Sequence, residues 1–222
     1  PLDLRRDKID RLVVDKLGLG HTPAPALEEW EKFVQKVIHP KHKVTIAVAG
    51  KYIELQDAYK SIYESLIHAG AHHDTKVQIV RVEAEAIEDH GAKAVIGDVD
   101  GILVPGGFGD RGIEGKILAA QYAREQKIPY FGICLGMQIA TIEYARNVCG
   151  LKEANSTEFD KATKHPVICL QEEQKGIEDM GATMRLGSSE SILFTGTQAA
   201  DLYGNVDRIH ERHRHRYEFN SD

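Results

Sequence analysis

Apolar and polar positions recur with two different periods along most of this chain. From Val44 onward, short apolar runs of strand length alternate with longer segments that have helical spacing. The strand-like runs cover residues 44–49, 76–82, 101–105 and 128–133, and the helix-like segments cover residues 57–69, 85–90, 112–126 and 135–146. This alternation predicts an α/β fold of three layers, with a mainly parallel central sheet and helices on both faces.

Residues 1–43 differ from the rest of the chain. They combine a basic, amphipathic start over residues 2–17, a patch rich in glycine and proline over residues 18–25, and a helix-like segment over residues 27–38. Pro40 and the basic residues after it separate this part from the first strong strand. We expect the first part to be a tail or linker and the compact domain to begin with that strand.

Past Asn155 the apolar runs become shorter, at residues 166–170, 183–186 and 191–194. Short strands with turn residues between them are typical of antiparallel pairing. We therefore expect these runs to form antiparallel strands along one edge of the sheet.

The composition excludes some classes of function. The chain has 222 residues, of which 42% are hydrophobic, and a formal net charge of −6, which suits one substantial core. No apolar run approaches the roughly twenty residues that cross a bilayer, and mild acidity gives no reason to expect a nucleic-acid partner. The three cysteines lack metal-ligand spacing and no signal peptide is visible, so we expect a cytoplasmic protein without disulfides or a metal site.

The strongest candidate for chemistry is Cys134, in the segment Gly132-Ile133-Cys134-Leu135-Gly136, where a strand-like run meets a helix-like one. A residue on such an elbow adopts strained φ/ψ values, and the flanking glycines let neighbouring backbone pass close to it. The following helix directs its first N–H groups at the sulfur, which favours the thiolate. These features predict a nucleophilic cysteine.

The ordinary interpretation of a free cysteine is a small buried hydrophobic residue. The glycine frame around Cys134 reverses that expectation. Cys149 and Cys169 have no such frame, so we interpret both as structural.

A second glycine-rich segment, Gly106-Gly107-Phe108-Gly109, follows the strand-like run 101–105. A phosphate-binding loop is one interpretation, but neither G-x-G-x-x-G nor the Lys-Ser/Thr of a P-loop is present. A plain flexible turn is another. We favour an oxyanion hole, in which the N–H groups of Gly107 and Leu135 meet the oxygen of a tetrahedral intermediate.

Two polar segments carry candidate binding residues. Glu158 is an isolated acid in a predicted loop, where a surface carboxylate is the ordinary interpretation. Residues 212–218 alternate arginine with histidine, which places three arginines on one face of a predicted strand. Arginine matches an α-carboxylate at two points and Glu158 suits an α-amino group, so we favour an amino-acid clamp over a nucleic-acid patch.

His213 and His215 are candidates for the base that a cysteine nucleophile requires. The interleaved arginines disfavour the protonated imidazole that such a base becomes. We therefore favour a structural or substrate-shaping role for both histidines.

Together these segments resemble the class I (triad) glutamine amidotransferases, and among them the glutaminase domains of the CTP synthase family. The cysteine elbow alone indicates only some amidotransferase, and the other segments are more specific. The resemblance runs from about residue 44 to residue 220 and is carried by residues 50–61, Pro105-Gly106-Gly107-Phe108-Gly109, Gly132-Ile133-Cys134-Leu135-Gly136-Met137-Gln138, Asn155-Ser156-Thr157-Glu158-Phe159, Met184-Arg185-Leu186-Gly187 and residues 211–218.

The resemblance implies that Cys134 attacks the side-chain amide of glutamine, which releases ammonia and leaves a glutamyl thioester that water hydrolyses. It also implies the residues that bind glutamine and its oxyanion, which are Gly107, Leu135, Gly136, Met137, Gln138, Glu158 and Arg216.

The partners implied by the resemblance lie outside this sequence. In the family, ammonia reaches a synthetase domain where ATP and Mg²⁺ serve the conversion of UTP to CTP, and GTP activates glutamine hydrolysis. We expect no cofactor in this chain itself. Glutamine, the synthetase domain and further copies of the chain, as a homotetramer, are the expected partners, without nucleic acid or membrane.

On the same resemblance, residues 1–43 are the end of the synthetase domain with an interdomain linker, and residues 44–222 are the amidotransferase domain. Family members carry the catalytic histidine and its glutamate partner in a His-Pro-Glu segment near the C-terminus. No His-Pro-Glu occurs in these 222 residues, so we expect the domain to be truncated before that segment. The alternatives are an inactive module that binds glutamine or mediates assembly, and another cysteine hydrolase with the same type of sheet.

Overall fold

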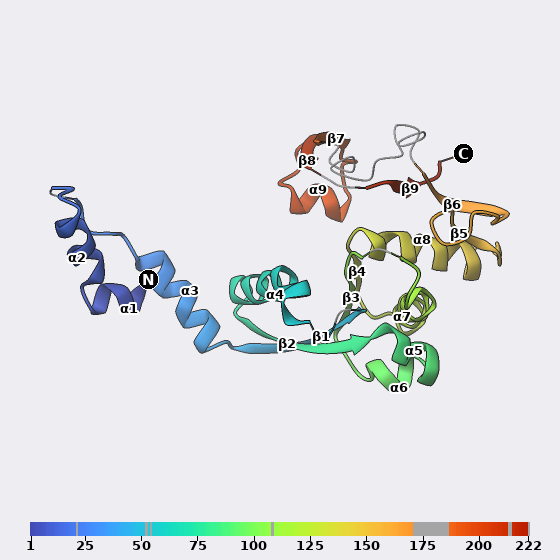
Figure 1. Cartoon of the computed structure of the whole chain (residues 1–222), viewed down its shortest axis with the longest axis horizontal. Coiled ribbons are helices and arrows are strands. Elements are labelled where there is room, and N and C mark those ends of the chain that lie inside the picture. Colours follow the sequence, from blue (N-terminus) through green and yellow to red (C-terminus); the bar gives the residue numbers. More distant parts are fainter. Residues whose placement is uncertain are drawn as a thin grey trace. The chain divides into compact units, whose positions relative to one another are not determined.

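The computed structural model describes residues 1–20, 22–51, 53, 55–107, 109–170, 187–212 and 215–221 (Figure 1). Helices and strands follow one another along this part of the chain. In order they are α1 (Leu2–Arg6), α2 (Ile9–Lys16), α3 (Glu28–Ile38), β1 (His42–Gly50), the short 3₁₀ helix η1 (Gln56–Tyr59), α4 (Lys60–His72), β2 (Thr75–Glu83), α5 (Ala84–His90), α6 (Ala92–Ile96), β3 (Gly101–Val104), α7 (Ile113–Gln126), β4 (Tyr130–Gly132), α8 (Leu135–Asn147), β5 (Ala154–Ser156), β6 (His165–Leu170), β7 (Ser188–Ile192), α9 (Gln198–Leu202), β8 (Arg208–Arg212) and β9 (Tyr217–Phe219).

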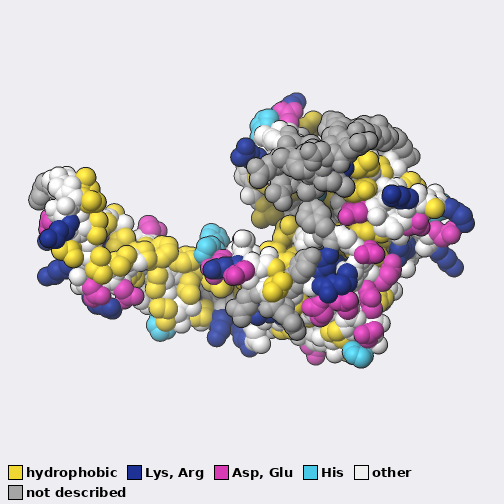
Figure 2. Space-filling model, viewed as in Figure 1, with side chains coloured by type: hydrophobic (Ala, Val, Ile, Leu, Met, Phe, Trp, Pro, Cys, Tyr) yellow, Lys and Arg dark blue, Asp and Glu magenta, His cyan; other side chains and the backbone are white. Residues whose placement is uncertain are grey.

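The contacts within the chain group it into two units. The first comprises Pro1–Ile46 with Glu54–Val80, and the second comprises Ala47–Ile53 with Arg81–Asp222. In the first unit, helices α1, α2 and α3 have no buried residue. Hydrophobic side chains therefore lie exposed along this helical segment, as Figure 2 shows.

Within the first unit, α3 packs against α4. The Phe33 ring lies 5.6 Å from Trp30 on its own helix and 5.7 Å from His68 on α4, measured between ring centroids. These apolar and aromatic contacts orient the helix that the spacing of residues 27–38 predicted. The assignment of residues 1–43 to a linker stays a prediction.

The central sheet has the strand order β2-β1-β3-β4 and is mainly parallel, with helices packed around it, as the alternating pattern predicted. Strand β3 is buried along its whole length and pairs in parallel with β4, with Val104 opposite Gly132. The carboxyl ends of these two strands therefore lie side by side. In parallel sheets, the loops at this edge form the ligand site.

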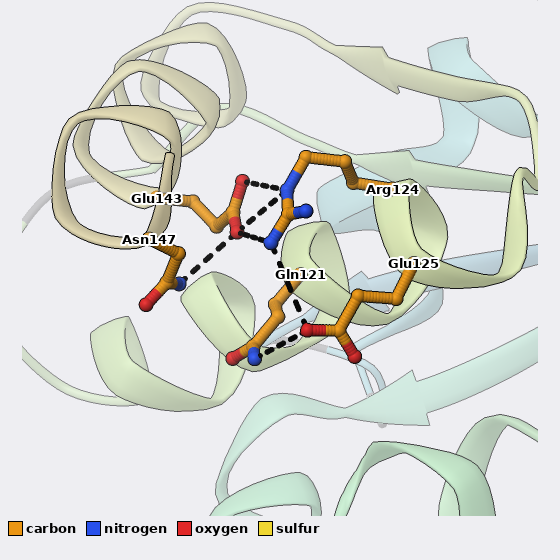
Figure 3. Close-up of polar contacts among 5 residues, drawn as sticks. All are labelled: Gln121, Arg124, Glu125, Glu143 and Asn147. Carbon is orange, nitrogen blue, oxygen red and sulfur yellow. Dashed lines mark hydrogen bonds and ion pairs between the residues drawn. The ribbon is translucent and has the colours of Figure 1, made fainter. Parts of the chain in front are cut away.

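Helices α7 and α8 pack against each other and against β3 and β4. Their shared core is a cluster of buried residues, namely Ile113, Ile117, Ala120, Leu135, Ile139, Ile142 and Ile168. An ion pair also joins the two helices, because the Arg124 guanidinium donates to both oxygens of the buried Glu143 carboxylate at 2.7 to 3.1 Å (Figure 3). The Asn147 side chain donates a further hydrogen bond to Glu143 at 3.0 Å.

The strands past residue 153 do not extend the central sheet. This corrects the expectation that they form antiparallel strands along one of its edges. In the described ranges they form a sheet of order β5-β6-β9 and a two-stranded sheet of β7 and β8. Strand β6 pairs in parallel with β5 and antiparallel with β9, so both of its hydrogen-bonding edges are used. The predicted run 183–186 lies outside the described residues.

The arginine-rich run is not one continuous strand, contrary to expectation. Arg212 ends β8, which pairs with β7, whereas Arg216 precedes β9, which pairs with β6. The run passes from one sheet to another, so its described arginines do not share a strand face. His213 and Arg214 lie outside the described residues.

Candidate active site

Cys134 occupies the elbow between β4 and α8. It is the N-cap of the helix and has φ 56° and ψ −108°, a strained conformation for a residue with a side chain. The Ile133 N–H donates to the Val104 carbonyl at 3.0 Å, and the Met137 N–H donates to the Cys134 carbonyl at 3.0 Å. These bonds hold the elbow on both sides, and the predicted strain at its central residue is confirmed.

The glycines on either side of Cys134 are required by close backbone contacts. A Cβ on Gly132 would lie 2.3 Å from the Gly136 carbonyl carbon, and a Cβ on Gly136 would lie 2.1 Å from the Val104 oxygen. Neither contact is sterically allowed. The prediction that the flanking glycines let neighbouring backbone pass close is therefore confirmed.

The Gly106–Gly107 loop lies directly against the cysteine. A Cβ on Gly106 would lie 3.3 Å from Cys134 Cβ and 3.7 Å from its Sγ, and one on Gly107 would lie 3.6 Å from Leu135 Cδ2. Cys134 itself is half-buried and forms no disulfide. The loop thus borders the sulfur, where donors for an oxyanion are needed. Donation by Gly107 and Leu135 stays a prediction.

Lys51 lies beside this loop and received no role from the sequence. It is buried, and its Nζ is 3.7 Å from the position that a Gly109 Cβ would take. The Arg111 guanidinium donates to the Lys51 carbonyl at 2.6 Å. The signal that was available is its position directly after β1, since residues at the carboxyl end of a parallel strand often belong to a site.

Glu158 interacts with the charge of Lys51. It is half-buried in the turn after β5, where its N–H donates to Ser156 Oγ at 3.1 Å. Burial raises the pKa of the Glu158 carboxyl, and a hydrogen bond from the Gly109 backbone and the charges of Lys51 and Arg216 oppose that rise. The charge of the predicted arginine therefore acts on the predicted acid, although more weakly than burial does.

The four residues after Cys134 differ in their surroundings. Leu135 and Gly136 are buried, whereas the Met137 side chain is 39% exposed. The buried Gln138 donates from Nε2 to the Tyr217 carbonyl at 2.8 Å. Their contacts with glutamine stay predictions. The Tyr217 contact joins α8 to the residue after Arg216, and sequence spacing gave no sign of it.

The described part of the chain leaves the base unassigned. His215 is half-buried just before Arg216, and its predicted structural or substrate-shaping role stays a prediction. None of the helices in the described ranges has the length and apolar character needed to cross a membrane.

The site combines a cysteine elbow, a glycine loop opposite it, and a carboxylate and a guanidinium in the same unit. This arrangement is expected of an enzyme that hydrolyses amides of amino acids. The model of the class-I glutamine amidotransferase family matches residues 54–222, and the chain belongs to that family.

Individual relatives define a narrower group. Over its whole length, the chain is 54% identical to the CTP synthases of Methanocaldococcus jannaschii and Caldanaerobacter subterraneus, but it spans only 42% and 41% of their lengths. It is also similar to the solved structure of the Trypanosoma brucei CTPS glutaminase domain with bound acivicin. That match has a TM-score of 0.72 and 43% identity, and covers 80% of this chain and 68% of that one.

Proposed function

We propose that this chain is the glutamine-hydrolysing C-terminal part of a CTP synthase, a ligase of pyrimidine biosynthesis. The observation that carries the proposal is the strained elbow that presents Cys134 to the Gly106–Gly107 loop. The similarity to CTP synthases over the whole chain supports the same assignment, and it does not favour an inactive module.

The thiolate of Cys134 attacks the side-chain carbonyl carbon of glutamine. The carbonyl electron pair moves to oxygen, where the N–H groups of Gly107 and Leu135 stabilise the developing charge. The carbon–nitrogen bond then breaks and nitrogen leaves as ammonia after it accepts a proton. Water adds to the remaining thioester and releases glutamate and the thiol.

The position of Cys134 favours the thiolate. The sulfur lies at the N-cap of α8, a helix of 13 residues, where the first N–H groups and the positive end of the dipole stabilise an anion. Proton transfer in both steps requires an imidazole. We assign it to the histidine of the His-Pro-Glu segment that the family resemblance implies.

The amino-acid end of glutamine carries a positive ammonium group and a negative carboxylate. We assign its ammonium to the Glu158 carboxylate and its carboxylate to Arg216, because the two side chains interact electrostatically and lie in the same unit as Cys134. Gly136, Met137 and Gln138 complete the predicted contacts around the substrate.

The remaining parts of the proposal concern the whole protein. Ammonia passes to a synthetase domain, where ATP with Mg²⁺ activates UTP and amination gives CTP, and GTP activates the glutaminase. We place this protein in the cytoplasm as a homotetramer, with residues 1–43 as the end of the synthetase domain and the linker.

Ammonia release from glutamine by the full protein tests the proposal. We expect Cys134→Ala to abolish release while the fold, followed by circular dichroism, is retained. Labelling with 6-diazo-5-oxo-L-norleucine and peptide mapping should modify Cys134. Label on another residue would indicate a different cysteine hydrolase, and absence of both label and ammonia would indicate an inactive binding module.

A further inference from the structure

Gln138 lies one helical turn after Cys134, on the same face of α8. Its side chain is only 4% exposed, and Nε2 donates to the Tyr217 carbonyl at 2.8 Å, across 79 residues of sequence. A buried amide in this geometry makes a strong, direction-specific contact. The helix that presents the nucleophile is therefore linked to the segment that carries Arg216.

Strand β9 follows directly after Arg216. Strand β9 pairs with β6 at three positions, and Tyr217, opposite Leu170, is the pair nearest to Arg216. The Tyr217 side chain packs on the core cluster that includes Leu135. Gln138 thus holds the carbonyl directly after Arg216, at the point where the β-ladder with Leu170 ends.

We propose that Gln138 is a positioning residue that fixes Arg216 relative to Cys134 and thereby selects glutamine over its shorter homologue asparagine, an inference that rests on the proposed function. Glutamine and asparagine present the same charged end and differ by one methylene group. A fixed spacing between thiol and guanidinium places only one of the two carboxamides at the sulfur. A variable spacing weakens the binding of glutamine and lowers the preference for glutamine over asparagine.

A direct contact between Gln138 and the substrate is a separate role. A primary amide has two N–H donors and one acceptor oxygen, so the bond to Tyr217 leaves groups for such a contact. The two roles give different results when Arg216 is absent. A positioning effect disappears with the residue that it positions, whereas a direct contact remains.

The test measures labelling of Cys134 in the full protein by three reagents. These are the glutamine analogue 6-diazo-5-oxo-L-norleucine, the asparagine analogue 5-diazo-4-oxo-L-norvaline, and iodoacetamide, which has no amino-acid end. In Gln138→Met we expect the half-saturating concentration of the glutamine analogue to rise about tenfold, as for loss of one buried hydrogen bond. The preference for it over the asparagine analogue should fall, and the iodoacetamide rate should stay within about twofold.

The Arg216→Met background decides between the two roles. There, Gln138→Met should cause a clearly smaller loss for the glutamine analogue than it does when Arg216 is present, because only the direct contact remains to be lost. A full additional loss would overturn the proposal, and so would unchanged binding and selectivity in the single variant. The matched control is Gln121→Met on α7, which removes the hydrogen bond from Gln121 to Glu125 without touching the site.

The iodoacetamide rate also reports whether the elbow remains folded. If Gln138→Met does not fold, Gln138→Asn keeps the amide but shortens its reach, and the same changes are expected. Failure of the proposed function would appear differently, as a wild-type protein that the glutamine analogue does not label in preference to iodoacetamide.

Discussion

The Tyr130 hydroxyl donates a hydrogen bond to the backbone carbonyl of Gly136 at 2.8 Å. Tyr130 begins β4 and Gly136 lies in the first turn of α8, so the bond spans the Cys134 elbow from the strand before it to the helix after it. Burial raises the pKa of the Tyr130 phenol, which keeps it protonated and able to donate.

We predict that Tyr130→Phe lowers the free energy of unfolding by about 1 kcal/mol, because one partly buried hydrogen bond is lost with little change in packing. Urea denaturation measures the change. Tyr144→Phe, at a residue of α8 that is 54% exposed, is the matched control and should leave stability nearly unchanged. Equal effects of the two substitutions would contradict a role for the Tyr130 bond.

Most of the order of helices and strands between residues 44 and 147 could be predicted because it depends on local pattern, but the short elements η1 and α6 were not expected. The runs 101–105 and 128–133 correspond to the buried strand β3 and to β4. The division of the later strands into separate sheets could not be predicted in this way. Pairing of β6 with both β5 and β9 depends on contacts between segments far apart in sequence.

The candidate site likewise has residues that the sequence predicts and residues that it does not. Cys134 and its glycines follow from the local requirements of a tight turn. Lys51 was missed because its relevance comes from contact with Gly109, 58 positions later, and nothing in the residues next to it indicates that contact. The bond from Gln138 to Tyr217 is likewise visible only in three dimensions.

We predict that Gly136→Ala lowers the free energy of unfolding by about 3 kcal/mol or more, because the new Cβ would lie 2.1 Å from the Val104 carbonyl oxygen. Gly150→Ala is the control, since Gly150 has φ 75° but open space around it. There the conformational cost alone, about 1 to 2 kcal/mol, is expected. Thermal or urea unfolding of the two variants separates a steric clash from a φ effect, and an equal cost would contradict the clash.

Lys51 should affect glutamine binding through Glu158. The pKa of the Glu158 carboxyl is raised by burial, and the Lys51 charge opposes that rise. Only the ionised carboxylate holds an ammonium group, so the KM for glutamine should increase as pH falls through this pKa. In Lys51→Met the opposing charge is lost, the pKa moves further up, and the increase in KM should begin at higher pH.

Glutaminase kinetics over a range of pH measure this effect. Lys51→Arg keeps the charge and should retain most of the wild-type profile. If the profile of Lys51→Met coincides with that of the wild type, Lys51 does not act through Glu158.

Lys116 should make stability depend on pH in the alkaline range. Its side chain in α7 is only 2% exposed, and burial, with a smaller contribution from the Lys51 charge, lowers the pKa of Lys116 from 10.5 to about 8. Between about pH 8 and 10.5 the unfolded chain binds more protons at this residue than the folded chain does. The free energy of unfolding should therefore rise with pH through this window, by about 3 kcal/mol in total at about 1.4 kcal/mol per pH unit.

Lys116→Met removes the titrating group and should remove this rise. Urea denaturation of both proteins at pH 7 and pH 10 measures it, because the other titrating groups are shared and cancel in the difference. The stability of the variant relative to the wild type should be highest at pH 7, where the wild type buries a charge, and should fall by pH 10. A difference that is the same at both pH values would show that the Lys116 ammonium is solvated in the folded protein.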